Sequence, residues 1–468
     1  MNGTERSDVD WLDVVDPDSG DAVGRVQCTS RESIDAAIER AANMVAAAPP
    51  ARHRRSEALS KCADFIVANV NDFISTLVSE GIKTISEATV EVKRAEATLR
   101  DYARLALDSS SSLSAVADGS PKGDRVTAHV EDTPVGVVAA FTPFNDPLNL
   151  VAHKLGAAIA AGCPVIVKPH ELTPMSGDLL IRNTDWSSLE AGFVQVVHGL
   201  GRTAGDQLVR DRRVAAISFT GGVDTAQQIS ATAGLKLLLF ELGGNCPTLI
   251  WNDAELEAAV PALISGMTAA AGQNCLHVQR IYAHADIHDE LLVRLVDGLN
   301  AVRLGSKVDA ATQMGPLITP EVAQRIHTAV GAAATAGAQI AAGGDRHGRA
   351  GHQPTLLVDV DAQSPLNLDE VFGPVTTLTP IDSLSKALTL MNRTPTPLQA
   401  GVYTNTLDVA ATCSTQLRFG AVLINRTSDF RIDTLPFGGP RHAGIGREGG
   451  RYGIQHLTQP QLTLTSVR

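Results

Sequence analysis

Short apolar runs that alternate with helical segments constrain the fold of this chain more than any other feature. A helical pattern over 153–161, closed by Gly162, separates two of these runs. Parallel strands need a long crossover between them, usually a helix, so the alternation predicts an α/β fold built on a doubly wound parallel sheet. The predicted strands are residues 137–141, 165–167, 193–197, 214–219 and 237–240.

The segments on either side of this core have a different texture. Residues 31–107 carry apolar side chains at three- and four-residue spacing, which predicts helices. A Ser-rich stretch over 109–119 is typical of a linker, and alternation over 126–130 predicts an exposed strand. A second α/β stretch begins at Ala254, and residues 459–468 predict an edge strand.

Size and charge exclude several classes of protein. The 468 residues suffice for two large or three ordinary domains, whose cores need no disulfide or metal. With 39 Lys and Arg against 51 Asp and Glu, the net charge is −12, so neither a nucleic acid nor an anionic membrane is an expected partner. The one basic cluster, 52–55, opens a helical pattern and predicts a solvated helix start.

The cysteines and the N-terminal segment point to a reducing compartment. Six cysteines are scattered without a CxxC pair or metal-ligand spacing, so we expect neither a disulfide framework nor a bound metal. Residues 1–13 are polar and acidic, unlike a signal peptide, and no apolar run reaches the length of a membrane span. These features predict a soluble, cytoplasmic protein.

Polar or glycine-rich turns follow the predicted strands at the ends where a parallel sheet binds its ligands. Each turn alone is an ordinary chain reversal, and the Gly199-Leu200-Gly201 pattern alone is a weak signal. Turns on consecutive strand ends together predict a binding site along one edge of the sheet. The four turns are Thr142-Pro143-Phe144-Asn145, Lys168-Pro169-His170-Glu171, Phe219-Thr220-Gly221-Gly222 and Glu241-Leu242-Gly243-Gly244.

Cys275, at the end of Gly272-Gln273-Asn274-Cys275, is the candidate nucleophile of this site. A single cysteine is more often a small buried apolar residue, and Cys246 is interpreted in that way. Cys275 differs because the turns that carry Glu241 and Asn145 accompany it. A thiolate nucleophile needs a base and a donor for the oxyanion that it creates, and a carboxylate and an amide can supply them.

With these motifs the chain resembles the aldehyde dehydrogenase superfamily, over about residues 16–464. Two further motifs carry the resemblance, Glu370-Val371-Phe372-Gly373-Pro374 and Pro436-Phe437-Gly438-Gly439. Seven motifs in order at family-like spacing make it highly specific. The segment Ser428-Asp429-Phe430-Arg431 is similar to the branch that contains phosphonoacetaldehyde, lactaldehyde and non-phosphorylating glyceraldehyde-3-phosphate dehydrogenases.

The resemblance implies that an aldehyde is oxidised to its carboxylic acid through a covalent intermediate. Cys275 matches the nucleophile that forms a thiohemiacetal, and Asn145 with the Cys275 backbone N–H matches the oxyanion hole. Hydride transfer to the nicotinamide leaves a thioester, and Glu241 matches the general base that activates water to hydrolyse it. The alternatives are a CoA-acylating relative, which typically lacks this Glu, and a non-catalytic structural or binding protein.

The resemblance also implies a nicotinamide dinucleotide cofactor. Lys168 and Glu171 match residues at the adenosine ribose, and Glu370 matches one at the nicotinamide ribose. The Glu171 carboxylate would repel a 2′-phosphate, which favours NAD, with NADP as the alternative. Gly222 stands where the family usually has Ser, and Phe144 where Trp is more common. The other implied cofactor residues are Thr142, Pro143, His170, Gly201, Phe219, Thr220, Gly221, Leu242, Gly243 and Phe372.

The resemblance divides the chain into three parts. Residues 1–120 and 134–243 match the NAD-binding domain, and 244–442 match the catalytic domain. Residues 121–133 with 443–468 match a small β flap that has little core of its own and is marginal alone. We therefore expect a homodimer or homotetramer in which the tail strand adds to a partner subunit's sheet.

Five residues are candidates for substrate binding, and they predict an anionic substrate. The resemblance implies that Arg94, His153 and Arg431 converge on the tunnel to the nucleophile, where unpaired buried cations are costly unless an anion pairs with them. Arg426 lies near the tunnel mouth, and Asn274 stands where that branch often has Arg. The expected substrate is a small phosphonate-bearing aldehyde such as phosphonoacetaldehyde or phosphonoformaldehyde. The alternatives are lactaldehyde, glyceraldehyde 3-phosphate or a semialdehyde.

Overall fold

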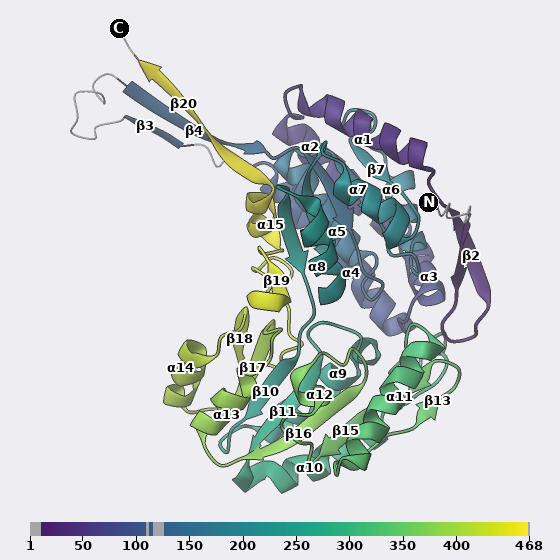
Figure 1. The fold of residues 1–468 in the computed structure, drawn as a ribbon, viewed down its shortest axis with the longest axis vertical. Coiled ribbons are helices and arrows are strands. Elements are labelled where there is room, and N and C mark those ends of the chain that lie inside the picture. Colours follow the sequence, from purple (N-terminus) through teal and green to yellow (C-terminus); the bar gives the residue numbers. More distant parts are fainter. Residues whose placement is uncertain (1–10, 109–111, 116–125, 467–468) are drawn as a thin grey trace, which may run out of the picture.

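The computed structural model describes residues 11–108, 112–115 and 126–466, and Figure 1 shows two α/β lobes with a projecting β arm. The first lobe is built on a sheet with strand order β19-β9-β8-β5-β6-β7. Strands β5 to β9 are parallel to their neighbours, and the short β19 is antiparallel to β9. The strands are β5 (Val137–Phe141), β6 (Val165–Lys168), β7 (Val194–Val196), β8 (Val214–Thr220), β9 (Leu237–Glu241) and β19 (Gly444–Ile445).

Helices cover both faces of this sheet, because successive side chains of a strand point to opposite faces. Val138 and Ala140 of β5 belong to the same apolar cluster as α2, α4 and α5, whereas Val137 and Ala139 belong to that of α1, α7 and α8. The predicted doubly wound fold is therefore confirmed. The helices are α1 (Arg31–Val45), α2 (Arg52–Ala68), α3 (Val70–Glu80), α4 (Ile85–Leu105), α5 (Asn149–Ala161), α6 (Met175–Asn183), α7 (Asp206–Arg210) and α8 (Val223–Ala233).

Helix α5 lies at the centre of this lobe and is buried along its whole length. It begins at Asn149, four residues before the predicted start, because Glu91 Oε1 accepts hydrogen bonds from the backbone N–H groups of Leu148 and Asn149 at 2.9 and 3.1 Å. It ends, as predicted, at Gly162, which has a φ of 90°. This burial decides how two side chains of α5, His153 and Lys154, can act in the site.

The second lobe contains a seven-stranded sheet within the described residues, with order β12-β15-β16-β11-β10-β17-β18. This confirms the second α/β stretch, although its first strand starts at Cys246, before the predicted Ala254. The strands are β10 (Cys246–Ile250), β11 (Val278–His284), β12 (Gln339–Ala342), β15 (Thr355–Val358), β16 (Val375–Ile381), β17 (Gln399–Tyr403) and β18 (Ala421–Ile424). The helices are α9 (Leu256–Thr268), α10 (Ala285–Asn300), α11 (Pro320–Thr335), α12 (Pro365–Leu368), α13 (Leu384–Met391) and α14 (Leu407–Gln416).

The arm that projects from the first lobe is an antiparallel sheet with order β20-β4-β3 (Figure 1). Strand β20 (Thr458–Ser466) pairs with β4 (Val126–Pro134) along its whole length, and both were predicted as strands. Strand β3 (Ser112–Ala115) lies in the Ser-rich stretch that predicted a linker, so that prediction is wrong there; the rest of the stretch lies outside the described residues. Serine is compatible with a strand whose partner supplies the ladder hydrogen bonds.

Smaller elements join these parts. A hairpin of β1 (Trp11–Val15) and β2 (Ala22–Gln27) lies beside the first lobe, β13 (Arg346–His347) pairs with β14 (Gly351–His352), and α15 (Gly450–His456) precedes β20. The predicted division at residue 443 stays a prediction, but β19 pairs with the first lobe rather than with the arm. Within the described ranges, no helix is long and apolar enough to cross a membrane.

Candidate active site

A cavity of about 1710 Å³ lies between the two lobes, at the carboxyl ends of β5, β6, β8 and β9. Its wall contains all of the predicted catalytic and cofactor residues, and four of the five predicted substrate residues; His153 is the exception. The turns after the four strands therefore meet at one sheet edge, as the sequence predicts. What each side chain can do there depends on its burial and its partners.

Cys275 is positioned by a strained turn. The chain passes through a short 3-10 helix, Ala269–Gly272, in which Ala270 and Ala271 both have a φ of 51°. Left-handed backbone costs a non-glycine residue about 1–2 kcal/mol, so neighbouring contacts must hold this turn. Glu87 of α4 accepts the Ala270 N–H at 2.7 Å.

Gln273 fixes the other end of the same turn. Its Nε2 donates to the carbonyl oxygens of Ala270 and Pro316 at 3.2 and 3.3 Å, and its Oε1 accepts the Ile318 N–H at 2.9 Å. Because Gln273 is fully buried, these bonds anchor the turn in the second lobe. The Cys275 thiol is thus presented to the cavity from a backbone with little freedom.

The surroundings of Cys275 favour the neutral thiol. Burial raises its pKa well above the ordinary value, and the neighbouring Cys246 and Glu370 raise the pKa further, whereas the Arg431 charge lowers it. Cys246 is fully buried and its Sγ donates to the Cys275 carbonyl oxygen at 3.3 Å. Burial raises the Cys246 pKa to about 12, which suits the predicted structural role of that residue.

Glu241 ends β9 as a buried carboxylate without a donor. Its side chain is 3% exposed, and neither oxygen has a hydrogen-bond partner among the described residues. Gly438, which has a φ of 136°, leaves room for the Glu241 carboxylate, since a Cβ on Gly438 would lie 2.7 Å from Glu241 Oε1. Burial, together with the Glu448 charge, raises the Glu241 pKa well above its ordinary value. A carboxylate whose pKa is raised in this way is a stronger base than an ordinary carboxylate, which suits it to accept a proton.

A buried ion pair that the sequence analysis missed lies next to Glu241. Lys154 Nζ of α5 is 3.4 Å from Glu448 Oε1 and 3.2 Å from Ser218 Oγ of β8. Burial raises the Glu448 pKa, but the charges of Lys154, His153 and Arg431 outweigh it and hold the pKa at about 2. The signal was present: Lys154 is a charged residue inside an otherwise apolar helix.

Asn145 follows β5 and is 8% exposed. Among the described residues its side-chain amide has no hydrogen-bond partner, although it lines the cavity with Cys275. The next residue, Asp146, forms ion pairs with Lys83 and Arg94. The amide of Asn145 is therefore free to donate to an oxygen atom held near the Cys275 thiol.

The first-lobe side of the cavity has the features of a dinucleotide cradle. Lys168 Nζ lies 3.3 Å from Glu171 Oε2, and burial lowers the pKa of Lys168 against the opposing effect of Glu171. The hydroxyl oxygens of Thr142 and Thr220 are buried and have no partner within the described ranges. Gly222 precedes α8 with open space around it, so the first N–H groups of that helix face the cavity without obstruction.

Glu370 reaches this cradle from the second lobe. Its Oε1 accepts the Gly244 N–H at 3.0 Å, and a Cβ on Gly243 would lie 2.1 Å from Oε2. Burial raises the Glu370 pKa to about 7. Phe372 packs edge-on against Phe144, with ring centroids 5.8 Å apart. These residues fit a nicotinamide dinucleotide, because unpaired polar groups and close-approach glycines lie along one continuous cavity.

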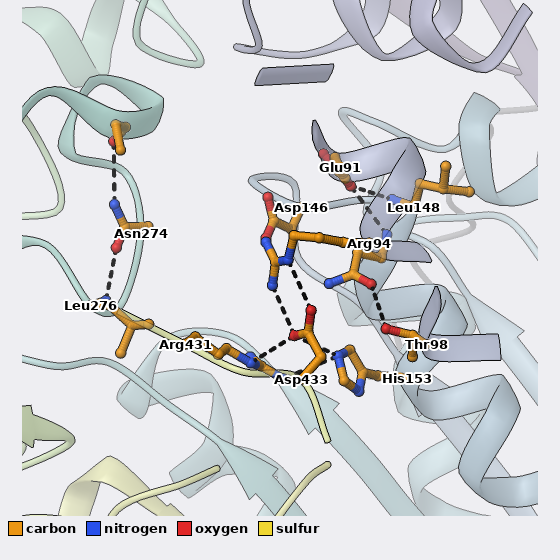
Figure 2. A network of polar contacts seen from close by, with 12 residues as sticks. Glu91, Arg94, Thr98, Asp146, Leu148, His153, Asn274, Leu276, Arg431 and Asp433 are labelled. Carbon is orange, nitrogen blue, oxygen red and sulfur yellow. Dashed lines mark hydrogen bonds and ion pairs between the residues drawn. The ribbon is translucent and has the colours of Figure 1, made fainter. Parts of the chain in front are cut away.

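The predicted substrate cations do converge, but on a carboxylate of the protein (Figure 2). Arg94 Nε and Nη2 donate to the two oxygens of Asp433 at 2.9 Å each, and Arg94 Nη1 donates to Asp146 at 3.2 Å. Arg431 Nε lies 3.0 Å from Asp433 Oδ1, and its Nη2 donates to Glu448 at 3.2 Å. Burial raises the Asp433 pKa, but these contacts with His153, Arg94 and Arg431 pull the pKa far below its ordinary value.

Two of the five substrate candidates, His153 and Asn274, differ from expectation. His153 is fully buried behind Asp433, with its Nε2 3.1 Å from Asp433 Oδ1, so it does not line the cavity. Asn274 lines the cavity, but its Nδ2 donates to the Ala269 carbonyl and its Oδ1 accepts the Leu276 N–H, apart from the cations in Figure 2. Arg426 is exposed. His153 cannot reach the cavity because α5 is buried on all sides. The Asn274 side chain is not available to a substrate because it forms hydrogen bonds within its own turn.

Asp433, which neutralises this cluster, was also missed by the sequence analysis. It lies in the loop before Phe437, and a single acid in a polar loop gives no signal of which distant cations will reach it. Arg431 also stacks on Phe437, with its guanidinium carbon 3.9 Å from the ring centroid. The position of Arg431 is therefore fixed by a ring and two carboxylates.

The site combines a dinucleotide cradle on a doubly wound sheet with a cysteine, Cys275, and an unpaired carboxylate, Glu241. This combination defines a nicotinamide-dependent enzyme with a cysteine nucleophile. The chain belongs to the aldehyde dehydrogenase family, whose model matches residues 4–463. Sequence similarity and structural similarity to known members both extend over nearly the whole chain.

Three relatives illustrate the similarity. Aspartate-semialdehyde dehydrogenase 1 of Pseudomonas canavaninivorans is 38% identical, with 97% of each chain covered. 3-Sulfolactaldehyde dehydrogenase of Priestia aryabhattai is 32% identical, covering 100% of this chain and 97% of the relative. The structure of glyceraldehyde-3-phosphate dehydrogenase GapN from Methanocaldococcus jannaschii, complexed with NADP, has a TM-score of 0.92 at 31% identity, covering 97% of this chain and 99% of that one.

Proposed function

We propose that this enzyme oxidises a small aldehyde bearing an anionic group to its carboxylic acid, with Cys275, Asn145 and Glu241 as catalytic residues. After the Cys275 thiol has released its proton to solvent, the thiolate sulfur bonds to the aldehyde carbon, the carbonyl π bond breaks and the carbonyl oxygen becomes an alkoxide. Asn145 and the Cys275 backbone N–H donate to that oxygen, and such donors are worth about 3–4 kcal/mol in a dry site. When bound, the nicotinamide accepts the hydride that the aldehyde carbon releases.

Glu241 acts in the second half of the reaction. Loss of the hydride leaves an acyl group on the Cys275 sulfur, and water must break that bond. The unpaired, buried Glu241 carboxylate takes the proton from this water, and the thiolate leaves as the acid forms. Retention of Glu241 supports hydrolysis rather than transfer to CoA, and retention of both Cys275 and Glu241 supports an enzyme rather than a binding protein.

Glu171 supports NAD over NADP. Its carboxylate is held by Lys168 at the cradle, where it would accept hydrogen bonds from ribose hydroxyls and repel a 2′-phosphate. One named relative binds NADP in its solved structure, so the comparison of the two cofactors belongs in the test. A ratio of kcat/KM for NAD over NADP above one would support the role of Glu171.

The anionic substrate is supported by one observation at Arg431. Its side chain is 11% exposed and lines the cavity, while its Nη1 has no acceptor among the described residues. Arg431 also influences the pKa of both Cys275 and Glu241, which places its charge close to the reaction. An anionic group on a short aldehyde would accept from this Nη1 while the carbonyl reaches the thiol.

The charge balance around Arg431 favours a singly charged group over a phosphonate dianion. Arg94 and Arg431 are already shared by Asp433, Asp146 and Glu448, which leaves little surplus positive charge. Two relatives are named for aldehydes with one acid group each, a carboxylate in aspartate semialdehyde and a sulfonate in sulfolactaldehyde. We therefore propose a carboxylate or sulfonate substrate, and retain phosphonoacetaldehyde as the rival to be measured.

The test compares kcat/KM for 4-oxobutanoate, phosphonoacetaldehyde, lactaldehyde and butanal, each with NAD and with NADP. We expect 4-oxobutanoate to exceed butanal by at least about tenfold, as one charge-assisted contact of 1.5–3 kcal/mol implies. Arg431→Lys should reduce the rate on 4-oxobutanoate mainly through KM. Arg303→Lys, the same change at an exposed site outside the cavity, is the matched control.

Equal kcat/KM for butanal and 4-oxobutanoate would reject the proposal of an anionic substrate. A higher kcat/KM for phosphonoacetaldehyde than for 4-oxobutanoate would show that the enzyme prefers a dianionic substrate. Product that appears only when CoA is added would reject hydrolysis by Glu241.

We also retain two expectations from the sequence, a cytoplasmic location and a homodimer or homotetramer. Strand β20 supports assembly, because it forms the outer edge of the arm with Leu462 and Leu464 both 58% exposed.

A further inference from the structure

Asp429 is a cavity-lining acid that the mechanism above does not use. It is half-buried, and it lies two positions before Arg431 on the loop that follows β18. Buried contacts fix the backbone on both sides of it. Gln399 Nε2 donates to the carbonyl oxygens of Ser428 and Phe430 at 2.8 and 3.1 Å, and Ser428 Oγ donates to the Leu276 carbonyl at 3.0 Å. The backbone that carries Asp429 is therefore held in place at the wall of the cavity.

Within the described ranges Asp429 has no donor, a property that it shares with Glu241 but not with the acids that pair with Lys83, Arg94 and Lys154. Asp146 pairs with Lys83 and Arg94, Asp433 with Arg94, and Glu448 with Lys154. Among the described residues, the Asp429 side chain takes part in no hydrogen bond or ion pair. The charges of Arg94 and Lys83 lower the pKa of Asp429, but the two side chains form their ion pairs with other carboxylates. A partner for Asp429 must come from outside the protein chain.

The electrostatics of Asp429 favour a cationic partner over a neutral one. Burial raises the Asp429 pKa to about 6, and the charge of Asp146 adds to this, against the opposing charges of Arg94 and Lys83. At neutral pH the carboxylate is thus ionised in a poorly solvated place beside another acid. A positive charge gains most there, because it offsets both the lost hydration and the like-charge repulsion.

We propose that Asp429 is a specificity-determining residue that binds an ammonium group of the substrate. This inference rests on the proposed function, in which Arg431 binds the anionic group. Both residues line the same cavity and stand two positions apart, so one small zwitterion can satisfy both. The substrate class is an α-amino acid whose side chain ends in an aldehyde, with the carboxylate on Arg431, the ammonium on Asp429 and the aldehyde at Cys275.

The geometry also disfavours simpler substrates. An aldehyde with an ammonium and no acid would leave Arg431 Nη1 without its acceptor, and one with an acid alone would leave Asp429 desolvated and unpaired. An unpaired buried group lowers affinity, which is how sites built for polar groups reject analogues that lack them. The pair Asp429 and Arg431 therefore selects for both charges together.

Three aldehydes that differ only at carbon 2 test the proposal: 2-amino-4-oxobutanoate, 2-hydroxy-4-oxobutanoate and 4-oxobutanoate. With the wild-type enzyme and NAD, we expect kcat/KM for the amino compound to exceed that for 4-oxobutanoate by at least about tenfold. Asp429→Asn should remove this advantage and leave 4-oxobutanoate within about twofold. The control is Asp297→Asn, the same change at an exposed position of α10 that should alter none of the three rates.

Each outcome separates this inference from the proposed function. Equal rates on the amino compound and 4-oxobutanoate, with both far above butanal, would overturn the role of Asp429 and leave the anionic substrate intact. If the hydroxy compound exceeds 4-oxobutanoate by the same factor as the amino compound does, Asp429 accepts a hydrogen bond from a neutral donor. That result would overturn the proposal that Asp429 binds an ammonium group. Equal rates on all four aldehydes, butanal included, would overturn the proposed function itself.

A binding measurement keeps the test independent of turnover. Calorimetry with the products, 2-aminobutanedioate and butanedioate, reports affinity without chemistry. Wild-type enzyme should bind the amino product at least about tenfold more tightly, and Asp429→Asn should bind the two alike. Asp429→Glu, which keeps the charge, should retain part of the preference, and a complete loss in that variant with an unchanged melting temperature would contradict an electrostatic role.

Discussion

Arg94 and Asp433 form a two-point contact, in which Arg94 Nε and Nη2 donate to Asp433 Oδ2 and Oδ1 at 2.9 Å each. It joins α4 of the first lobe to the loop before Phe437, across the wall of the cavity. A planar fork that holds a carboxylate in this way is specific in direction and strong for its size. Arg94 is thereby committed to the protein, whereas Arg431 keeps one nitrogen for a ligand.

The first prediction follows from this commitment. Arg94→Ala should lower the free energy of unfolding by about 1–3 kcal/mol, because Asp433 and Asp146 each lose one of their partners. It should also slow anionic and neutral aldehydes alike, measured as kcat/KM for 4-oxobutanoate and butanal. The loss of stability in the double variant Arg94→Ala/Asp433→Ala should differ from the sum of the two single losses, since the two residues are in direct contact. A loss confined to the anionic aldehyde would instead make Arg94 a substrate ligand.

The fold could be predicted from the sequence because its signals are local. Apolar runs such as 137–141 and 214–219 mark buried strands, and the glycine at 162 marks the end of α5. The strand β3 was not predicted, because its alternation, Ser112-Leu113-Ser114-Ala115, covers only four residues of a Ser-rich stretch and the strand depends on pairing with β4.

The candidate site could be predicted only in part, for a related reason. Asn145, Glu241 and Cys275 stand at strand ends or in motifs, where position along the chain already indicates position in space. The partners of Arg94 and His153 are set by tertiary contacts that join residues far apart, such as 94 with 433. Sequence therefore predicts which charges gather, but it does not predict that Asp433 neutralises them.

The second prediction concerns Cys275. Cys275→Ala should abolish turnover and leave the affinity for NAD within a few fold, because the thiol is not part of the dinucleotide cradle. Sub-stoichiometric iodoacetamide with mass mapping should label Cys275 before Cys246, which is fully buried. The rate should increase with pH, since burial raises the Cys275 pKa and the thiolate is the reactive form. Preferential labelling of Cys246 would reverse the assignment of the nucleophile.

The third prediction concerns Glu241. Glu241→Gln should give a burst of about one reduced cofactor per active site and then stall, because the acyl group stays on Cys275. Stopped-flow absorbance at the reduced-nicotinamide band measures both phases. Steady turnover at the wild-type rate would show that another group activates the water.

The fourth prediction concerns assembly through the arm. The wild-type protein should have a light-scattering mass of at least two 49.1 kDa chains at micromolar concentration. Leu462→Asp/Leu464→Asp should reduce this mass, because it places charges on the apolar outer edge of β20. Leu235→Asp, at a fully exposed leucine between α8 and β9, is the matched control and should not change the mass. A wild-type mass of one chain would contradict the proposal.

The fifth prediction concerns Glu448, whose charge faces Glu241. Burial and then Glu448 raise the Glu241 pKa, while Lys154 and Arg431 lower it. Glu448→Gln removes the like charge and frees both cations, so the Glu241 pKa should fall. The base is then ionised at lower pH, and the acid limb of the pH profile of deacylation should move to lower pH. Glu39→Gln, at an exposed position of α1, should leave the limb in place. A limb that stays fixed or moves to higher pH in Glu448→Gln would show that Glu448 does not set the pKa of the base.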